Sequence, residues 1–211
     1  MKKWIKIAGL LLLMLPAAVS ADDFTYTTNA DNTITITGYT GPGGMVTIPD
    51  MINGKAVTSI GVGAFYPCTS LTNAMIGIGV TSIGEWAFAC TSLPHITIPN
   101  SVTNIGQYIF YCCSGLTDVM IPSSFTSIEG WTFASCTSLT NITIPDSVTN
   151  IGENAFQSCT SLTNVMLPNS VASIENGAFA NCTSLASITI PNSVTIIGDK
   201  YITFGGYAGV F

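Results

Sequence analysis

The sequence contains no arginine, and three of its five lysines lie within the first six residues. Beyond residue 21, the basic residues are Lys55 and Lys200, whereas all eleven acidic residues lie there. The net charge of that part is therefore 2 − 11 = −9. Nucleic acids and anionic membranes are bound through clusters of basic side chains. Both classes of partner are excluded.

Groups that carry catalysis or bind metals are also scarce. His95 is the single histidine, and the repeat pattern places only Thr and Met columns near it, with no nucleophile that it could activate. The sequence has no phosphate-binding loop, nucleophile elbow or paired carboxylates. It also lacks the Cys-x-x-Cys and histidine spacing of zinc sites. We expect no enzymatic activity, no cofactor and no metal.

Long apolar runs are absent except at the start of the chain. Residues 7–18 form one such run, after a basic segment and before the small residues that end at Ala21. This order is typical of a secretory signal peptide, and the run is shorter than the roughly 20 residues of a membrane-spanning helix. We predict a signal peptide at 1–21 and a mature chain that is secreted or at the cell surface, without a transmembrane span.

What the sequence does have is a repeat of about 23 residues. Isoleucine marks it at 60, 83, 105, 128, 151, 174 and 197. In one unit, residues 141–144 alternate polar and apolar, which predicts a short strand that ends at Pro145. A second short extended segment follows at 148–151, and Phe156 is expected in a helical or 3-10 turn. Such a fixed period predicts a solenoid in which each coil packs on its neighbours.

The consensus Leu-x-x-Ile-x-Ile-Pro-x-x-Val-x-x-Ile-Gly-x-x-Ala-Phe-x-x-Cys-x-x-Leu resembles the BspA-like class of leucine-rich repeats over about residues 45–202. The resemblance implies a β-rich α/β solenoid, a leucine-rich repeat right-handed superhelix with short parallel strands and short helical or 3-10 turns. We place the solenoid at 57–202, after an N-terminal β-hairpin cap and degenerate first repeat at 22–56. Residues 203–211 are either a tail or a cap.

Six cysteines form one column of the repeat. They are expected to be buried free thiols, with disulfides as the alternative, and Cys112 stands outside this column. The column contains Cys68, Cys90, Cys113, Cys136, Cys159 and Cys182.

Two surface strips are candidates for binding a partner. The first is an outward column of the predicted sheet, with polar residues beside it, and its exposed methionines suit an adaptable binding surface. Its candidate contact residues are Met75, Thr97, Met120, Thr143, Met166, His95, Asp118 and Asn141. The second is the aromatic patch Trp86, Tyr108 and Trp131, either a platform for a sugar or apolar partner or a gap-filling cluster on the convex edge.

Together these features predict a non-enzymatic exported protein that binds an extracellular or surface protein or glycan. The family resemblance implies a role in adhesion. The alternative is a structural spacer or envelope component with no ligand of its own.

Overall fold

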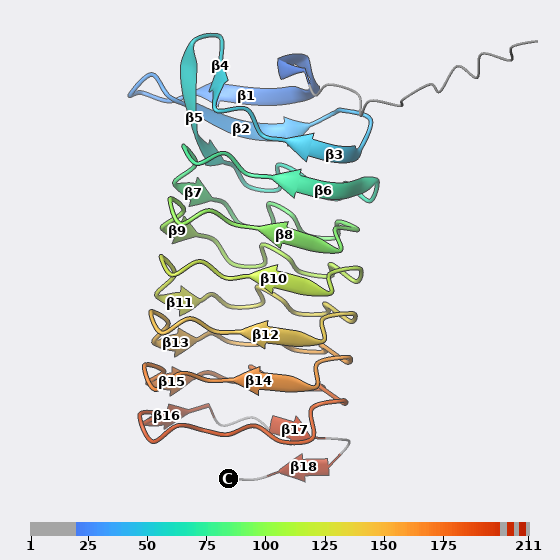
Figure 1. The fold of residues 1–211 in the computed structure, drawn as a ribbon, viewed down its shortest axis with the longest axis vertical. Coiled ribbons are helices and arrows are strands. Elements are labelled where there is room, and N and C mark those ends of the chain that lie inside the picture. The colour runs from blue at the N-terminus through green and yellow to red at the C-terminus, as the bar shows by residue number, and fades with distance from the viewer. Residues whose placement is uncertain (1–19, 199–201, 205–206, 210–211) are drawn as a thin grey trace, which may run out of the picture.

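The computed structural model describes residues 20–198 and the backbone of two further strands, β17 (Ile202–Phe204) and β18 (Tyr207–Gly209), which pair antiparallel. Almost all of the predicted signal peptide lies outside the described residues. About seven coils are stacked in one column, with the N-terminal strands at one end and β18 at the other (Figure 1). No described helix is long and apolar enough to cross a membrane.

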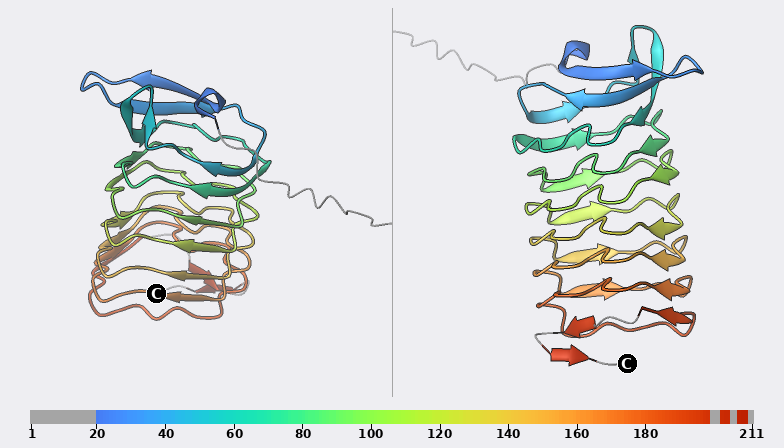
Figure 2. Two further views of the ribbon diagram at one scale, coloured as in Figure 1. Left: turned by 45° about the horizontal axis from the view of Figure 1, so that its top comes forward. Right: turned by 180° about the vertical axis from the view of Figure 1, so that it is seen from behind.

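Each coil except the last described one contributes one strand to each of two walls. The tilted view and the view from behind show both walls (Figure 2). Strands of the first wall are β3 (Gly44–Thr47), β6 (Leu71–Met75), β8 (His95–Thr97), β10 (Asp118–Met120), β12 (Asn141–Thr143) and β14 (Asn164–Met166). Strands of the second wall are β5 (Lys55–Ile60), β7 (Ser82–Ile83), β9 (Asn104–Ile105), β11 (Ser127–Ile128), β13 (Asn150–Ile151), β15 (Ser173–Ile174) and β16 (Ile196–Ile197). Successive strands within a wall run parallel, for example β10 with β8 and β13 with β15.

The core is a ladder of phenylalanine rings, one from each coil. All are at most 1% exposed, and neighbouring rings stack with centroid separations of 4.9 to 5.9 Å. The ladder consists of Phe65, Phe88, Phe110, Phe133, Phe156 and Phe179. Because each coil buries its apolar side chains against its two neighbours, the fold is held together by contacts between successive repeats.

At the N-terminal end, two hairpins precede the regular coils. The first consists of β1 (Phe24–Thr28) and β2 (Ile34–Tyr39), and it places Phe24 6.4 Å and Tyr39 5.5 Å from the ring of Phe65. The second pairs β4 (Met51–Ile52) with β5 through Asn53 and Gly54, which both have positive φ, as an Asn-Gly hairpin turn requires. The first hairpin covers the end of the phenylalanine ladder.

The predicted helical turns are wrong, and with them the α/β description. Within the described residues the single helical segment is the 3-10 turn η1 (Ala21–Asp23), and the bends around each phenylalanine consist of turns. Around Phe133 the amides alternate: Ala134 donates to Trp131 of its own coil, while Phe133 itself donates to Ala155 of the next coil. A helix would direct all of these amides along its own axis. The residues two positions before and after the phenylalanine ring instead adopt positive φ, as Trp131 (59°) and Ser135 (61°) do.

One column assignment is also wrong. Thr91, which is 2% exposed, occupies the place of the buried cysteine in its coil, and its hydroxyl donates to the carbonyl of Phe88 at 2.9 Å. Cys90 instead lies one residue earlier, in the column that Cys112 also occupies, and both residues have positive φ. The missing residue of this short coil therefore lies between Thr91 and Leu93, after the column position.

Both walls are interrupted at the coil that contains β10 and β11. In the first wall β10 pairs with β8 but not with β12, and in the second wall β9 and β11 belong to different sheets. This coil carries Phe125, 3% exposed, in a column that otherwise contains valine, such as Val102 and Val148. The larger ring requires additional space inside a closely packed stack, which explains why the strand ladders separate here.

Candidate binding surface

The outward column of the first wall runs along the stack, and strand pairing links its members except between Met120 and Thr143, where β10 and β12 are not paired. Register places Met75 beside Thr47 and Thr97, Met120 beside Thr97, and Met166 beside Thr143 and Thr189. Methionine and threonine alternate strictly along it, in the order Thr47, Met75, Thr97, Met120, Thr143, Met166 and Thr189. We call this column the Met-Thr strip.

The three methionines of the predicted site are exposed by 53% at Met75, 65% at Met120 and 64% at Met166. Their orientation follows from strand alternation, since the intervening Val119 and Val165 point inward and are each 4% exposed. The structure therefore places large apolar side chains on the surface at regular intervals.

A polar column lies beside the Met-Thr strip. Asp118 pairs in register with His95, and Asn141 pairs with Asn164, and all four side chains are exposed. Each lies two residues before a member of the strip and thus on the same face of its strand. An apolar strip next to hydrogen-bonding groups is the arrangement found at the edge of protein interfaces.

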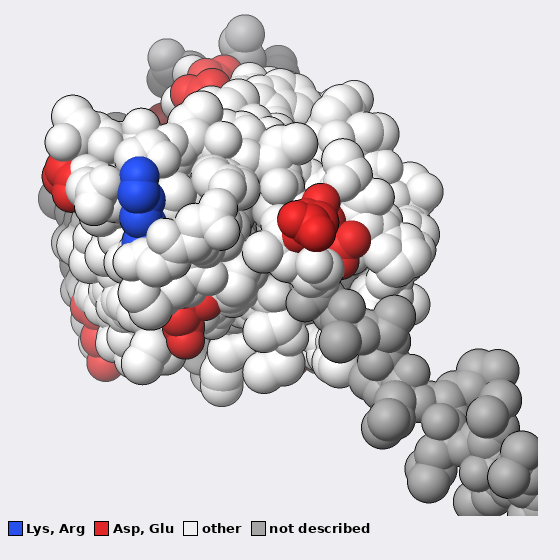
Figure 3. Space-filling model, turned by 90° about the horizontal axis from the view of Figure 1, so that it is seen from above, with Lys and Arg blue, Asp and Glu red and all other residues white. Residues whose placement is uncertain are grey.

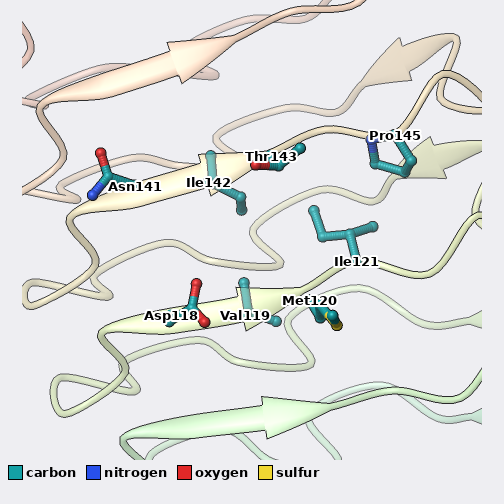
Figure 4. A pocket seen from close by; sticks show the side chains of 8 residues that line it. All are labelled: Asp118, Val119, Met120, Ile121, Asn141, Ile142, Thr143 and Pro145. Atoms are coloured by element: carbon teal, nitrogen blue, oxygen red, sulfur yellow. The ribbon is translucent and has the colours of Figure 1, made fainter.

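The interruption between β10 and β12 produces a cavity of about 210 Å³ on this face (Figure 4). It brings together four of the predicted contact residues: Asp118, Met120, Asn141 and Thr143. Val119, Ile121, Ile142 and Pro145 complete its lining. Its volume lies below the roughly 300–1,000 Å³ of pockets that enclose small molecules, so it suits one side chain of a larger partner.

The other predicted contact residues lie along the same face but outside this cavity. Met166 lines a second cavity of about 320 Å³, together with Asn164, Leu167, Ser187 and Thr189. Outside both cavities lie Met75 and Thr97 on the strip and His95 in the polar column beside it. Sequence reasoning missed four lining residues of the first cavity, because nothing in the repeat consensus indicates that β10 and β12 separate. They are Val119, Ile121, Ile142 and Pro145.

Charge is sparse on the described surface. The view onto the N-terminal end shows one basic group and separated acidic groups on a mostly uncharged surface (Figure 3). Several acids lie at the bend after the second wall, where Glu175 accepts hydrogen bonds from the Asn150 side chain at 2.9 Å and from the Glu153 amide at 3.1 Å. Among the described residues no three His, Cys, Asp or Glu side chains are grouped as metal ligands.

The aromatic patch is a stack of rings that face one another. Trp86 and Tyr108 lie 4.3 Å apart with planes at 6°, and Tyr108 and Trp131 lie 5.8 Å apart at 16°. Tyr111 contacts all three rings edge-on, and all four side chains are half-buried. Because a sugar stacks on the face of an aromatic ring, and these faces cover each other, the geometry favours the gap-filling role over a sugar platform.

Four cysteines of the predicted column lie in the core. The thiol of each donates to the carbonyl of the phenylalanine in the preceding coil, for example Cys159 to Phe133 at 3.1 Å. Burial raises the pKa of Cys113 to about 11 and that of Cys182 to about 12. These thiols are therefore protonated at neutral pH and serve as small apolar side chains with one hydrogen-bond donor.

The parallel two-walled stack, with one strand per wall in successive coils, defines a leucine-rich repeat solenoid. Six copies of the BspA type leucine rich repeat region match residues 45–162 and 103–204, and the chain belongs to this family.

Solved structures support the same assignment. The leucine-rich repeat protein of T. pallidum superposes with a TM-score of 0.80 at 34% identity over 85% of each chain. A leucine-rich cell surface protein of Faecalibacterium prausnitzii gives a TM-score of 0.76 at 40% identity over 87% of this chain, which spans 51% of that protein. A leucine-rich repeat protein of Eubacterium ventriosum, 24% identical with a TM-score of 0.69, shares the fold. No curated protein matches the chain.

Proposed function

We propose that this protein is an exported, non-catalytic binding protein that attaches to an extracellular or surface protein through its Met-Thr strip. The family and the solved relative described as a cell surface protein support a location outside the cytoplasm. The predicted signal peptide at 1–21 agrees with that location. A leucine-rich repeat scaffold presents many similar side chains on one rigid face, which suits recognition of an extended partner.

The observation that carries the proposal is the exposure of Met75, Met120 and Met166 in one column. Burying an apolar side chain of this size against a partner contributes about 1.5–3 kcal/mol. Methionine adapts its shape to the partner because its side chain has three rotatable bonds and a polarisable sulfur. The hydroxyls of the intervening threonines and the polar column beside the strip supply hydrogen bonds.

A protein partner is favoured over a glycan by two features. The lining of the cavity beside Met120 includes the apolar side chains of Val119, Ile121 and Ile142, which favours an apolar side chain of a protein partner. The rings of Trp86, Tyr108 and Trp131 are stacked on one another, so the central ring has both faces covered and each tryptophan has one face covered.

The test is binding of the purified protein to immobilised extracellular matrix proteins and to a glycan array. We expect binding to at least one matrix protein, weakened at least tenfold by Met120→Asp combined with Met166→Asp. A tenfold change in affinity corresponds to about 1.4 kcal/mol. Two carboxylates introduced into an apolar contact lose their hydration, and this loss costs more than that amount.

The matched control is Thr126→Asp combined with Ala172→Asp. These residues are exposed, lie two coils apart as Met120 and Met166 do, and adjoin the second wall. The control should retain full affinity, with unchanged circular dichroism in both double variants. Equal losses in the two variants would remove the Met-Thr strip from the binding site, and absence of binding to every probe would favour the spacer function instead.

A further inference from the structure

Two thiols outside the core lie side by side in successive coils. Cys90 and Cys112 occupy the same column, each two residues after a ladder phenylalanine, with φ of 54° and 57°. The amide of Cys90 donates to the carbonyl of Tyr111 at 2.8 Å, which fixes the register of the two coils next to Cys112. In the next three coils this column contains Ser135, Ser158 and Asn181.

The separation of the two residues suits a covalent bond. Neighbouring strands of a parallel ladder lie about 4.8 Å apart, within the about 4.4–6.8 Å that separates Cα atoms in disulfides. Because Cys90 and Cys112 have the same backbone conformation, their side chains leave the coil in the same direction. Burial, followed by the charge and the hydrogen bond of Cys112, raises the pKa of Cys90.

Access separates this pair from the core thiols. Cys90 and Cys112 are both half-buried at the bend, whereas Cys136 and Cys159, also in successive coils, are 0% exposed. The thiols of the core pair donate to the carbonyls of Phe110 and Phe133. A buried, protonated and hydrogen-bonded thiol reacts slowly with an oxidant. The spacing between coils would permit a disulfide in either pair. The greater exposure of Cys90 and Cys112 favours a disulfide between these two.

We propose that Cys90 and Cys112 form an inter-coil disulfide when the protein meets a disulfide oxidant. The thiolate of Cys112 attacks one sulfur of the oxidant, giving a mixed disulfide and releasing one thiol. The thiolate of Cys90 then attacks the Cys112 sulfur, which forms the Cys90–Cys112 bond and releases the second thiol. Two protein thiols are oxidised, the oxidant disulfide is reduced to two thiols, and two protons pass to those thiols.

The same bond and the same products result if Cys90 attacks the oxidant first and Cys112 resolves the mixed disulfide. The resulting bond joins one complete coil to the next and covalently links the two coils that carry Trp86 and Tyr108. Formation in the organism rests on the export proposed above, since disulfides persist in oxidising compartments. The chemistry of the purified protein does not rest on it, so the two proposals can fail separately.

The test is a redox titration of the purified protein with oxidised and reduced glutathione. After unfolding and alkylation with N-ethylmaleimide, we expect 7 − 2 = 5 labelled cysteines in place of the seven in the sequence. Peptides for mass spectrometry are best obtained with pepsin, because trypsin finds no arginine and few lysines. The cross-linked peptide should contain Cys90 and Cys112, and Tm should rise by about 5–10 °C, as expected from closing a loop of this length.

Two variants make the result decisive. Cys112→Ser and Cys90→Ser introduce the residue that the same column carries at 135 and 158. Each variant should fold, give no cross-linked peptide under oxidant and show no rise in Tm, and its remaining thiol at the bend should carry glutathione as a mixed disulfide. Seven labels at every glutathione ratio, a stable mixed disulfide without a cross-link, or a cross-link between Cys112 and Cys113 would each overturn the proposal.

Discussion

A single hydrogen bond explains why the buried column of the repeat contains cysteine. The thiols of Cys113, Cys136, Cys159 and Cys182 donate to the carbonyl of a ladder phenylalanine one coil earlier, at 3.1 to 3.2 Å. In the short coil, Thr91 takes this place, and its hydroxyl donates to the carbonyl of Phe88 in its own coil. The column therefore requires a small side chain with one donor, and residues other than cysteine can meet that requirement.

Replacing Cys159 by Ala should lower the free energy of unfolding by about 1–2 kcal/mol, because one buried hydrogen bond is lost and a small cavity remains. Cys159→Ser keeps a donor and should cost less than the alanine variant. Urea unfolding followed by circular dichroism measures both. Equal losses for Ser and Ala would show that the volume of the sulfur, and not its donor, is what the column needs.

The sequence could predict which residues are buried but not the backbone between them. Phe156, Cys159 and Leu162 are 0% exposed, as their columns indicate. The bend around Phe156 was nevertheless predicted as helical, since Ala and Phe carry no sign of positive φ. Asn154 and Ser158 adopt it, at 53° and 58°, because alternate amides must reach the next coil. This requirement for positive φ comes from the stacking of coils, so it cannot be recognised in the sequence of a single repeat.

At the scale of an element, the aromatic patch offsets an unfavourable backbone. The column of Trp86, Tyr108 and Trp131 has φ near 60° in every coil, and other coils place Gly63, Asn154 or Gly177 there. Bulky residues rarely adopt this conformation, which costs roughly 1–2 kcal/mol per residue. Ring pairs contribute about 0.5–1.5 kcal/mol each beyond the area they bury. Stacking of three rings in succession explains how the bend tolerates them.

Tyr108→Asn tests this account, since asparagine is the residue that another coil uses at the same position. The change removes all three ring contacts of the central side chain, to Trp86, Trp131 and Tyr111, while keeping a residue suited to positive φ. We expect the free energy of unfolding to fall by about 1–3 kcal/mol and binding to matrix proteins to stay unchanged. Unaltered stability combined with lost binding would identify the patch as a contact surface.

Part of the candidate site could be predicted from the sequence, because the sequence indicates which side chains face outward but not how the strands pair. Period-two alternation identified the outward residues, and the structure places Asp118, Met120, Asn141 and Thr143 around one cavity. The cavity itself depends on the separation of β10 from β12, which no alternation pattern encodes. The visible signal was Phe125 in a column of valines. Its effect on the strand ladders depends on how much space the neighbouring coils leave.

At the scale of the whole molecule, the stack consists of two blocks that share the coil of β10 and β11. This coil is hydrogen-bonded to the preceding block through β10 and β8 and to the following block through β11 and β13. The turns around its phenylalanine remain bonded on both sides, since Phe110 donates to Thr132 and Phe133 donates to Ala155. The interruption therefore affects the walls but not the bends.

Phe125→Val should restore the column and allow β10 to pair with β12. We expect slower amide hydrogen exchange in both strands, since paired amides are protected, and weaker partner binding, since the cavity beside Met120 closes. Val148→Phe is the matched converse and should introduce a second interruption one coil further on. Unchanged exchange in Phe125→Val would show that the separation has another cause.

The alternation of methionine and threonine gives the binding face a spacing twice that of the coils. Since neighbouring strands lie about 4.8 Å apart, each thioether is followed by the next after about 10 Å. A ligand that is itself periodic at this interval can engage several thioethers at once, so weak individual contacts combine into strong avidity. Inserting a single coil into such an array would break the alternation of methionine and threonine, whereas inserting a pair of coils would extend it.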